Sequence, residues 1–506
     1  MKINKFISIK IDEIFGADLR SLALLRMGLA IVVILDIIFR LPDLRAFYSD
    51  EGIMPRNLHI ELYGSSYISA YLLNGLSAVV GMLFITTVFF AILFFFGFHT
   101  KIANIVLWFL MTSLHGRNPL VLTGGDTLLH LILFWCMFLP LNACFSLDSF
   151  LSPKTSSKKE INHTIFSIPV IALFTQIAFV YSFTAACKIG PEWMKDGTAI
   201  YYALNIDQYV TPFGHSLLHF PKLLQFMTPC VFWLEAIGSL FMFSPVFNPQ
   251  IRLITIFAFI CLQLGFGYCL TVGIFPYITT VAILAFLPGL FWDKILPVVF
   301  KIKLLNSFMN YFVRKFSDIA VFLSKSGLAG SSQNNKLNLS TFVNIIVAFF
   351  LTTILLWNVQ SVEVLKFKMP TWLSTYSYFF GLEQSWIMFG PKFLREDFWY
   401  VYPGILKNGK RVDVFNKGSE ITWDRPSNLA NFYSNHRWKT YIRNLWVSDK
   451  RLQPYYAQYL CGEWNKNHTS ENQLSDIYFY YAREITLPNN KVDKPIYGLM
   501  YSHKCY

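Results

Sequence analysis

Long apolar runs separated by short polar connections occupy most of the first 290 residues, and one more run follows near residue 350. Nine of these runs approach or exceed the ~18–20 residues that an α-helix needs to cross a bilayer. They lie near residues 20–39, 72–98, 102–116, 127–143, 164–187, 229–247, 252–271, 272–290 and 341–358. The run 252–290 is continuous, and we divide it at Gly273. We therefore predict a polytopic α-helical membrane protein with about nine transmembrane helices.

The pattern changes after residue 360, where Asn, Asp, Tyr and Trp recur in short alternating runs. The tripeptide KNG at 407–409, set between apolar stretches, predicts a β-hairpin. The stretch 452–464 (LQPYYAQYLCGEW) has the pattern of a helix. These features predict a C-terminal extramembrane α+β domain over 360–506, after a transmembrane domain (1–292), a basic cytoplasmic linker (293–340) and a last transmembrane helix (341–359). The linker begins as FMNYFVRKF, a pattern that suits either an interfacial helix or a solvated loop.

Basic residues gather in the connections that an N-terminus-inside topology would place in the cytoplasm. They follow the start of the chain, the fourth run and the eighth run: Lys2, Lys5, Lys10, Lys154, Lys158, Lys159, Lys294, Lys301, Lys303, Arg314, Lys315 and Lys325. This topology, of the bacterial inner-membrane type, puts the C-terminal domain on the opposite face. It also explains the net charge of +13 in a chain with only 14% charged residues, so we expect membrane lipid and not nucleic acid as a partner.

The cysteines and histidines do not predict a metal site. The chain has no CxxC pair, and His215 and His219 lack the glutamate of an HExxH motif. Only Cys461 and Cys505 lie in a polar region, and an oxidising compartment would allow them to pair as a disulfide. The sequence leaves that pairing open.

Ionisable residues inside apolar runs are costly, so they pair, line a cavity or act chemically. Arg26 and Asp36 lie within the first run, and we interpret them as a charge pair that fixes helix packing. Glu235 lies in the sixth run. The topology brings further polar residues to one membrane interface, together with the turn after the first run (FYSDEGIMPRN): Arg117, Asn118, Asp126, Lys188 and Glu192. For Asp126 there is also a structural interpretation, as the N-cap of the fourth helix.

Lys188, in TAACKIGPEW, closes the fifth run, and two interpretations of it stay open. A lysine at the end of a transmembrane helix commonly extends its ammonium to the membrane surface as an anchor. A lysine that acts as a base must instead lose its proton, which requires burial in a low-dielectric site or a second cation nearby. A helix C-terminus and a pairing with Glu192 would both oppose that loss.

Several stretches resemble horizontally transferred transmembrane (HTTM) domain proteins, which are relatives of the vitamin K-dependent γ-carboxylase. They are DLRSLALLRMGLAIVVILDIIFRLPDLRAFYSDEGIMP, RNPLVLTGGDTLLHLILFWCMFLP, AACKIGPEWMKDGTAIYYAL and TVGIFPYITTVAILAFLPG. The resemblance covers about residues 12–292. More weakly, LEQSWIMFGP and NHRWKTYIRNLW resemble the tail of that group. The most specific match is the lysine followed five positions later by Trp193, with Gly197 beyond.

The resemblance implies a carboxylase-like (lyase) activity with a reduced, vitamin K-like quinone as cofactor and a secreted polypeptide as substrate. The base of that family matches Lys188. Two carboxylase histidines are replaced here, one by Asp126 in GGDT (124–127) and one by Gln263 before GIFP. We therefore take Lys188 and Asp126 as candidate catalytic residues. The candidate cavity residues are Arg117, Asn118, Glu192, Trp193 and Gln263.

The replaced histidines keep a second function class open. The chain would then be a non-enzymatic maturation or export factor that binds a secreted protein through its C-terminal domain. A transporter fits less well, because the sequence has no evident internal repeat.

Overall fold

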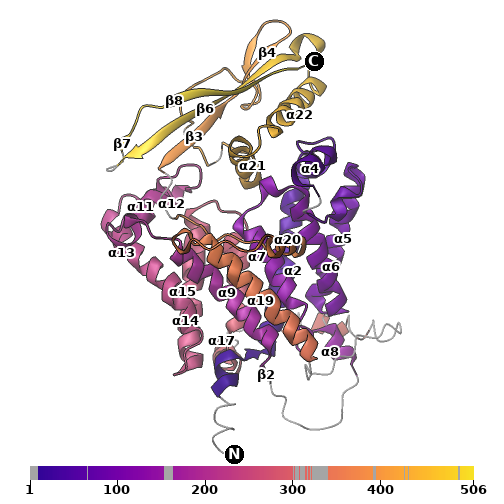
Figure 1. Cartoon of the computed structure of the whole chain (residues 1–506), viewed down its shortest axis with the longest axis vertical. Helices are drawn as coiled ribbons and strands as arrows, with labels where there is room; N and C mark the ends of the chain where they lie inside the picture. Colours follow the sequence, from indigo (N-terminus) through magenta and orange to yellow (C-terminus); the bar gives the residue numbers. More distant parts are fainter. Residues whose placement is uncertain are drawn as a thin grey trace, which may run out of the picture.

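The computed structural model describes residues 10–64, 67–152, 163–299, 340–390, 395–426, 428–430, 432–487 and 491–505, and isolated residues between 301 and 321. Most of the predicted linker 293–340 therefore lies outside the described residues. The described chain forms two parts (Figure 1). We call residues 17–299 and 340–390 the helical layer, and residues 395–505 the sheet region.

Six helical segments among the described residues are long and apolar enough to cross a membrane. They are α2–η1–α3 (Leu19–Arg40, Leu41–Asp43 and Leu44–Tyr48), α5 (Ser77–Phe96), α9 (Ile168–Ala186), α13–η4–α14 (Pro221–Trp233, Leu234–Gly238 and Ser239–Phe241), α15 (Asn248–Cys269) and α19 (Thr341–Ser361). A seventh crossing would be a bent pair, α16–η5 (Phe275–Ile283 and Leu284–Phe286) with η6–α17 (Phe291–Ile295 and Leu296–Val299), whose halves meet at 91°.

Each of the nine predicted runs contains a helix, but nine membrane crossings are not confirmed. The third and fourth runs form α6 (Thr100–Arg117) and α7 (Gly124–Cys136), which pack against each other in the helical layer. With 13 residues, α7 is about 20 Å long, which is too short to span the hydrocarbon core alone. The apolar composition thus predicted where these helices lie. Their lengths are set by the turns and caps at which they end, and the hydropathy pattern does not reveal those.

Short elements connect the long helices and cover the two ends of the layer. They are β1 (Ala17–Asp18), α4 (Arg56–Tyr63), η2 (Ala70–Leu72), η3 (Pro119–Val121), α8 (Leu147–Leu151), β2 (Thr164–Ile165), α10 (Pro191–Met194), α11 (Ala199–Leu204), α12 (Pro212–Leu217), η7 (Glu363–Leu365) and α20 (Thr371–Phe380). After α19 the chain does not leave the layer at once, because Gln384 accepts a hydrogen bond from Gln176 of α9 at 3.0 Å. The sheet itself begins at Glu396, later than the predicted domain boundary at 360.

The sheet region is an antiparallel sheet built around one long central strand, β6 (Leu474–Leu487). Strands β3 (Glu396–Val401) and β4 (Pro403–Leu406) pair with one edge of β6, and β8 (Ile496–Lys504) and β7 (Lys491–Val492) pair with the other. A tight turn joins β4 to β5 (Arg411–Asp413), with Gly409 at φ +83°. The hairpin predicted from KNG is therefore confirmed.

Three helical elements accompany the sheet: α21 (His436–Val447), α22 (Leu452–Lys466) and η8 (Ser470–Asn472). Helix α22 matches the helix predicted over 452–464. Cys461 of α22 and Cys505, just after β8, form a disulfide with their Cα atoms 5.5 Å apart. Helix α21 lies between the sheet and the helical layer (Figure 1), so its side chains reach both.

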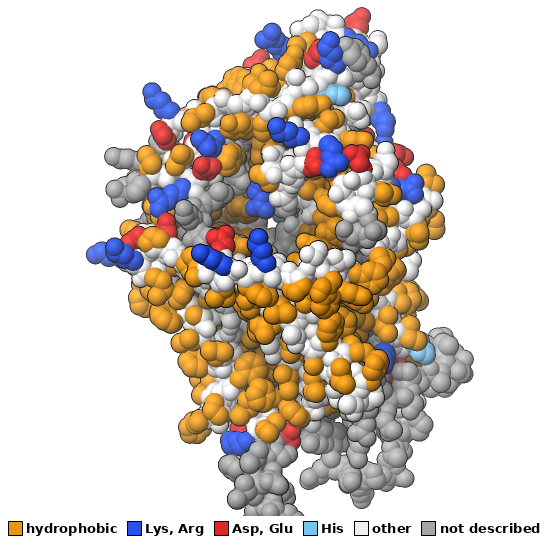
Figure 2. All heavy atoms as spheres, viewed as in Figure 1, with side chains coloured by type: hydrophobic (Ala, Val, Ile, Leu, Met, Phe, Trp, Pro, Cys, Tyr) orange, Lys and Arg blue, Asp and Glu red, His pale blue; other side chains and the backbone are white. Residues whose placement is uncertain are grey.

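The two ends of the helical layer differ. The sheet region stands at one end, whereas α8, α17 and β2 lie at the other (Figure 1). Apolar side chains cover much of the layer, and charged ones gather on the sheet region and at the boundary between the two parts (Figure 2). The apolar surface of the helical layer (Figure 2) suggests a membrane protein, with the C-terminal sheet region at one end of the layer.

Candidate functional site

Lys188 stands just past the end of α9, and its side chain turns into the protein. The helix stops at Ala186, where the chain bends toward Gly190 and Pro191. Only 2% of Lys188 is exposed. A lysine that anchors a helix keeps its ammonium in water or among headgroups, so this burial excludes the anchor interpretation.

Glu235 is the partner of Lys188, and it was not among the candidate cavity residues. The Lys188 ammonium donates to the Glu235 carboxylate, and both side chains are buried. Glu235 lies on η4, a π-helical turn in the segment α13–η4–α14, and such turns recur at functional sites. The Lys188 Nζ also lies 4.1 Å from the ring centroid of Trp193, a cation–π contact. Burial lowers the pKa of Lys188, and Glu235 opposes that shift.

The pair faces a cavity of about 600 Å³ at the boundary between the helical layer and the sheet region. The helical layer contributes Lys188, Glu235 and Phe266 to its lining. Helix α21 contributes a second wall, which consists of His436, Lys439, Thr440 and Arg443. Neither part alone encloses the site.

Hydrogen bonds from α21 fix this second wall against the helical layer. The Lys439 ammonium donates to the carbonyl oxygens of Gln208 at 2.9 Å and Thr271 at 3.1 Å, and to the Thr271 hydroxyl at 2.8 Å. Burial, and to a lesser degree Arg443, lowers the pKa of Lys439 to about 7. The three acceptor oxygens favour its charged form. Arg443 donates to the Tyr209 hydroxyl at 2.6 Å.

An apolar groove adjoins the cavity. Its volume is about 280 Å³, it lies between α13 and α15, and it shares Phe266 and Phe389 with the cavity. Apart from these two aromatics its lining consists of small, aliphatic and sulfur-containing side chains, with Trp193 at one side. Together, the cavity and the groove offer polar groups at one end and an apolar surface at the other.

A second group of buried charged side chains lies beside the cavity, and its members are all paired with one another. Asp36 of α2 accepts from Arg40 at 2.7 Å and from Arg437 of α21 at 2.5 Å. Asp126 of α7 accepts from the same two guanidinium groups, at 2.5 and 3.0 Å. The two carboxylates and two guanidinium groups balance in charge, and all four side chains are buried. We call these four residues the ion cluster.

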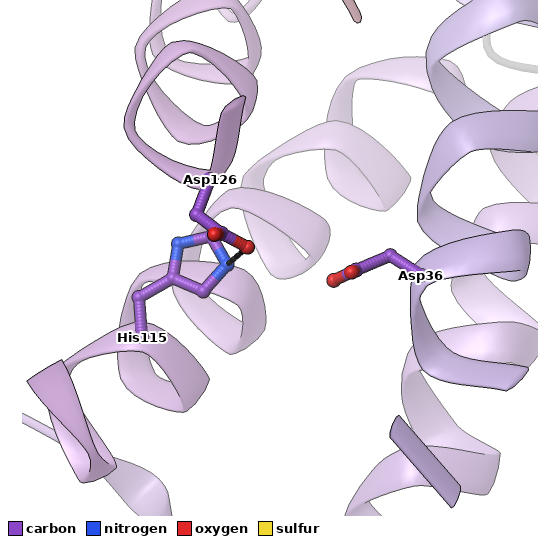
Figure 3. Close-up of side chains that lie close together, drawn as sticks. All are labelled: Asp36, His115 and Asp126. Carbon is purple, nitrogen blue, oxygen red and sulfur yellow. Dashed lines mark ion pairs between the residues drawn. The ribbon is translucent and has the colours of Figure 1, made fainter. Parts of the chain in front are cut away.

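The ion cluster is not arranged to hold a metal ion. Asp36, His115 and Asp126 do bring ligand atoms within 4.8 Å of one another, and Asp36 points toward the other two (Figure 3). However, both carboxylates already accept hydrogen bonds from guanidinium groups, so a cation placed there would meet two positive charges. His115 hydrogen-bonds His130, with Nδ1 atoms 3.0 Å apart.

The structure separates most of the residues that the sequence grouped together. Trp193 packs against Lys188. Asp126, a candidate catalytic residue, belongs to the ion cluster, and it closes the first turn of α7 by accepting from the Thr123 amide at 2.7 Å. The N-cap of α7 is Thr123, so the prediction of Asp126 as the N-cap was wrong.

The other candidate cavity residues make separate local contacts outside the cavity lining. Arg117 donates to the Ser49 carbonyl at 3.3 Å, and Asn118 to the Phe47 carbonyl at 3.1 Å. Glu192 pairs with Arg395 at 2.9 Å and not with Lys188. Gln263 donates to the Tyr181 hydroxyl at 3.1 Å. No two of these four contacts share a partner.

The predicted pairing of Arg26 with Asp36 was also wrong. The Arg26 guanidinium donates to the Phe94 carbonyl at 2.9 Å and to the Phe145 carbonyl at 2.6 Å. Asp36 pairs with Arg40, one helical turn further on, and with Arg437. The two residues lie ten positions apart on one helix, about 15 Å along its axis, which is too far for contact.

Two signals in the sequence pointed to the missed residues. Glu235 was visible as a carboxylate in an apolar run, but nothing local linked it to Lys188. The α21 wall lies in the stretch NHRWKTYIRNLW, whose basic residues recur at helical spacing without an assigned role. Comparison of the chain with protein-family models, with curated proteins and with solved structures gives no match.

Proposed function

We propose that the chain is a membrane enzyme of the carboxylase-like type, which acts on a lipid-soluble quinol and modifies a polypeptide at the outer face. The observation that carries the proposal is the Lys188–Glu235 pair, buried and facing a cavity at the boundary of the helical layer. A buried, perturbed acid–base pair in a cavity is a common arrangement in catalytic sites. The resemblance of TAACKIGPEW to the HTTM and carboxylase group supports the same assignment.

The pair suits proton transfer in either of its two protonation states. As an ion pair, the Glu235 carboxylate accepts a proton from a ligand hydroxyl, and the Lys188 ammonium stabilises the anion left behind. When the shared proton lies on Glu235, the free amine of Lys188 is the base. Burial, which lowers the pKa of Lys188, brings these two states closer in free energy.

The cavity and the groove fit an amphipathic ligand. A quinol ring carries hydroxyl groups for the polar cavity, and its isoprenoid tail suits the apolar groove between α13 and α15. When bound, the quinol would supply the oxidisable ring. The protein would supply proton transfer through Lys188 and Glu235, and exclusion of water by the aromatic side chains around them.

Asp126 and Gln263 do not take the places of the missing histidines in this proposal. Both carboxylate oxygens of Asp126 are already bonded, and Gln263 contacts Tyr181 away from the cavity lining. Glu235 is the better candidate, because it contacts Lys188 directly. The cofactor and the polypeptide substrate remain those that the resemblance implies.

The test compares the secreted proteins of a strain that expresses the chain with those of strains that carry variants. We expect wild type to add carbon dioxide to glutamate side chains, seen by mass spectrometry as carboxylated peptides. Lys188→Ala and Glu235→Gln should each abolish that signal, whereas Lys222→Ala, an exposed lysine, should retain it.

An unchanged mass profile in Lys188→Ala would instead favour the non-enzymatic maturation factor. Deleting residues 360–506 cannot separate the two functions, because that deletion removes the α21 wall of the cavity. Point substitutions of Lys188 are therefore the decisive variants.

A further inference from the structure

The cavity that Lys188 and Glu235 face carries more positive than negative charge. As a pair, Lys188 and Glu235 have no net charge, whichever of them holds the shared proton. The imidazole of His436 adds no charge, because burial lowers its pKa to about 4. The other two ionisable side chains of the wall, Lys439 and Arg443, are basic, and no carboxylate among the described lining residues balances them. Cavity walls with an excess of one charge attract a ligand group of the opposite charge.

Arg443 is the basic residue that still has hydrogen-bond donors to offer. It lies one helical turn beyond Lys439 on α21, so the two side chains project from the same face of the helix. The three N–H donors of Lys439 already bond to Gln208 and Thr271. The Arg443 guanidinium has five donors, and in the described part of the chain it bonds only to the Tyr209 hydroxyl, at 2.6 Å. Arg443 is exposed and lines the cavity, so a ligand can reach the remaining donors.

Tyr209 fixes the positions of both basic side chains. Its hydroxyl accepts from Arg443, and its ring centroid lies 4.2 Å from the Lys439 Nζ, a cation–π contact. The two cations also repel each other, because Arg443, after burial, lowers the pKa of Lys439, to about 7. A bound anion would offset this repulsion and favour the charged form of Lys439. The α21 wall therefore suits an anionic ligand group.

The cavity has an apolar and a polar approach. The apolar groove adjoins it between α13 and α15, which belong to segments long and apolar enough to cross a membrane. A lipid-soluble ligand would use this approach. Arg443 belongs instead to the exposed surface of the sheet region, so a group that binds it arrives from water. The planar fork of a guanidinium group matches the two oxygens of a carboxylate.

We propose that Arg443 binds the carboxylate of an acidic side chain on a polypeptide substrate, at the solvent side of the cavity. The inference rests on the proposed function, because it assigns a binding residue for the polypeptide that the same site modifies. It predicts that the site distinguishes acidic segments from segments that carry the corresponding amides. Tyr209 is a positioning residue, because it acts through the guanidinium group.

The experiment measures binding of a fluorescent, glutamate-rich peptide to the full chain in detergent at physiological ionic strength. The same peptide with glutamine in place of glutamate is measured in parallel. Because the net charge of +13 attracts acidic peptides in general, the matched control is Arg411→Gln, at an exposed arginine of β5. We expect Arg443→Gln to weaken binding of the glutamate peptide about tenfold, which is the effect of one lost charged hydrogen bond at an exposed site.

The other variants separate geometry from charge. Arg443→Lys keeps the charge but not the planar fork, so it should recover only part of the affinity. Tyr209→Phe removes the hydroxyl that holds the guanidinium group, and it should weaken binding less than Arg443→Gln does. Arg411→Gln should match wild type. If Arg443→Gln melts early, Arg443→Lys tests the same contact.

The outcomes separate this inference from the proposed function. If wild type binds the two peptides equally well, or if Arg443→Gln binds the glutamate peptide as tightly as wild type, the role of Arg443 is refuted. Loss of bound phosphatidylglycerol in Arg443→Gln, with unchanged peptide binding, would identify a lipid headgroup as the anion and overturn the proposal. Absence of carboxylated peptides in the wild-type strain would instead refute the proposed reaction, and it would leave an Arg443-dependent preference for glutamate intact.

Discussion

The Lys188–Glu235 pair and the ion cluster are both buried charges near α21, but they differ in how completely they are bonded. In the ion cluster each carboxylate contacts two guanidinium groups. Among the charged residues that the structure describes, Lys188 and Glu235 contact only each other, and they border a cavity. Burial of a charge therefore does not mark a reactive site. The features that indicate a reactive site are an incomplete set of charged partners and a side that faces a cavity.

This difference in bonding indicates separate roles for the ion cluster and the Lys188–Glu235 pair. Arg437 enters the helical layer from the sheet region and completes the ion cluster, so the cluster joins the two parts. The residues that follow Arg437 on α21 form the second wall of the cavity. The ion cluster thus positions the cavity wall, whereas the Lys188–Glu235 pair borders the cavity and, under the proposed function, exchanges a proton with the ligand.

Arg437→Ala should give the largest effect and test the structural task. It leaves Asp36 and Asp126 with one guanidinium group, an uncompensated buried charge that costs about 3–5 kcal/mol. We expect a strongly lowered melting temperature in detergent and faster proteolytic release of the sheet region. Arg451→Ala, at an exposed pair with Asp449, should leave the melting temperature close to that of wild type. Equal melting temperatures of the two variants would show that the ion cluster does not join the sheet region to the helical layer.

Changes at the Lys188–Glu235 pair should have smaller effects on stability. Lys188→Met leaves one buried carboxyl, which takes up a proton, and we expect a loss of about 1–3 kcal/mol. Adding Glu235→Gln should recover much of that loss, because no charge then remains. A double-mutant cycle of melting temperatures measures the coupling. If the double variant were the least stable of the four proteins, the pair would be a structural joint like the ion cluster.

The smallest expected effect is a pH dependence at Asp397 of β3, which lies outside both charge groups. Burial, followed by Glu484, raises the pKa of Asp397 to about 7. The folded state therefore keeps a proton that the unfolded state releases above about pH 4. The contribution of Asp397 to stability then falls as pH rises from about 4 to about 7.

Asp397→Asn keeps the side-chain oxygen that accepts from the Asp207 amide at 3.0 Å and removes the titration. The melting temperature of the full chain should therefore decline less between about pH 4 and about pH 7 in the variant than in wild type. Asp424→Asn, at an exposed carboxylate, should leave that slope unchanged. Identical slopes in all three proteins would count against a perturbed Asp397.

The predicted grouping of five residues at one membrane interface failed for a general reason. Counting crossings assigns Arg117, Glu192 and Lys188 to a side of the membrane, but it does not fix their directions around the helix axes. Residues on one side can therefore face different neighbours. Arg117 turns toward Ser49, Glu192 toward Arg395, and only Lys188 toward the cavity.

The sequence by itself determined the apolar helices, the KNG hairpin, helix α22 and Lys188 as the residue to examine first. These depend on local properties, namely hydropathy over a helix length, turn chemistry and a charge at the end of an apolar run. The tertiary structure alone decided the partners. Lys188 and Glu235 are 47 positions apart, and Asp36 and Arg437 are 401 apart. Such pairs depend on how helices rotate and pack, and no local pattern encodes those rotations.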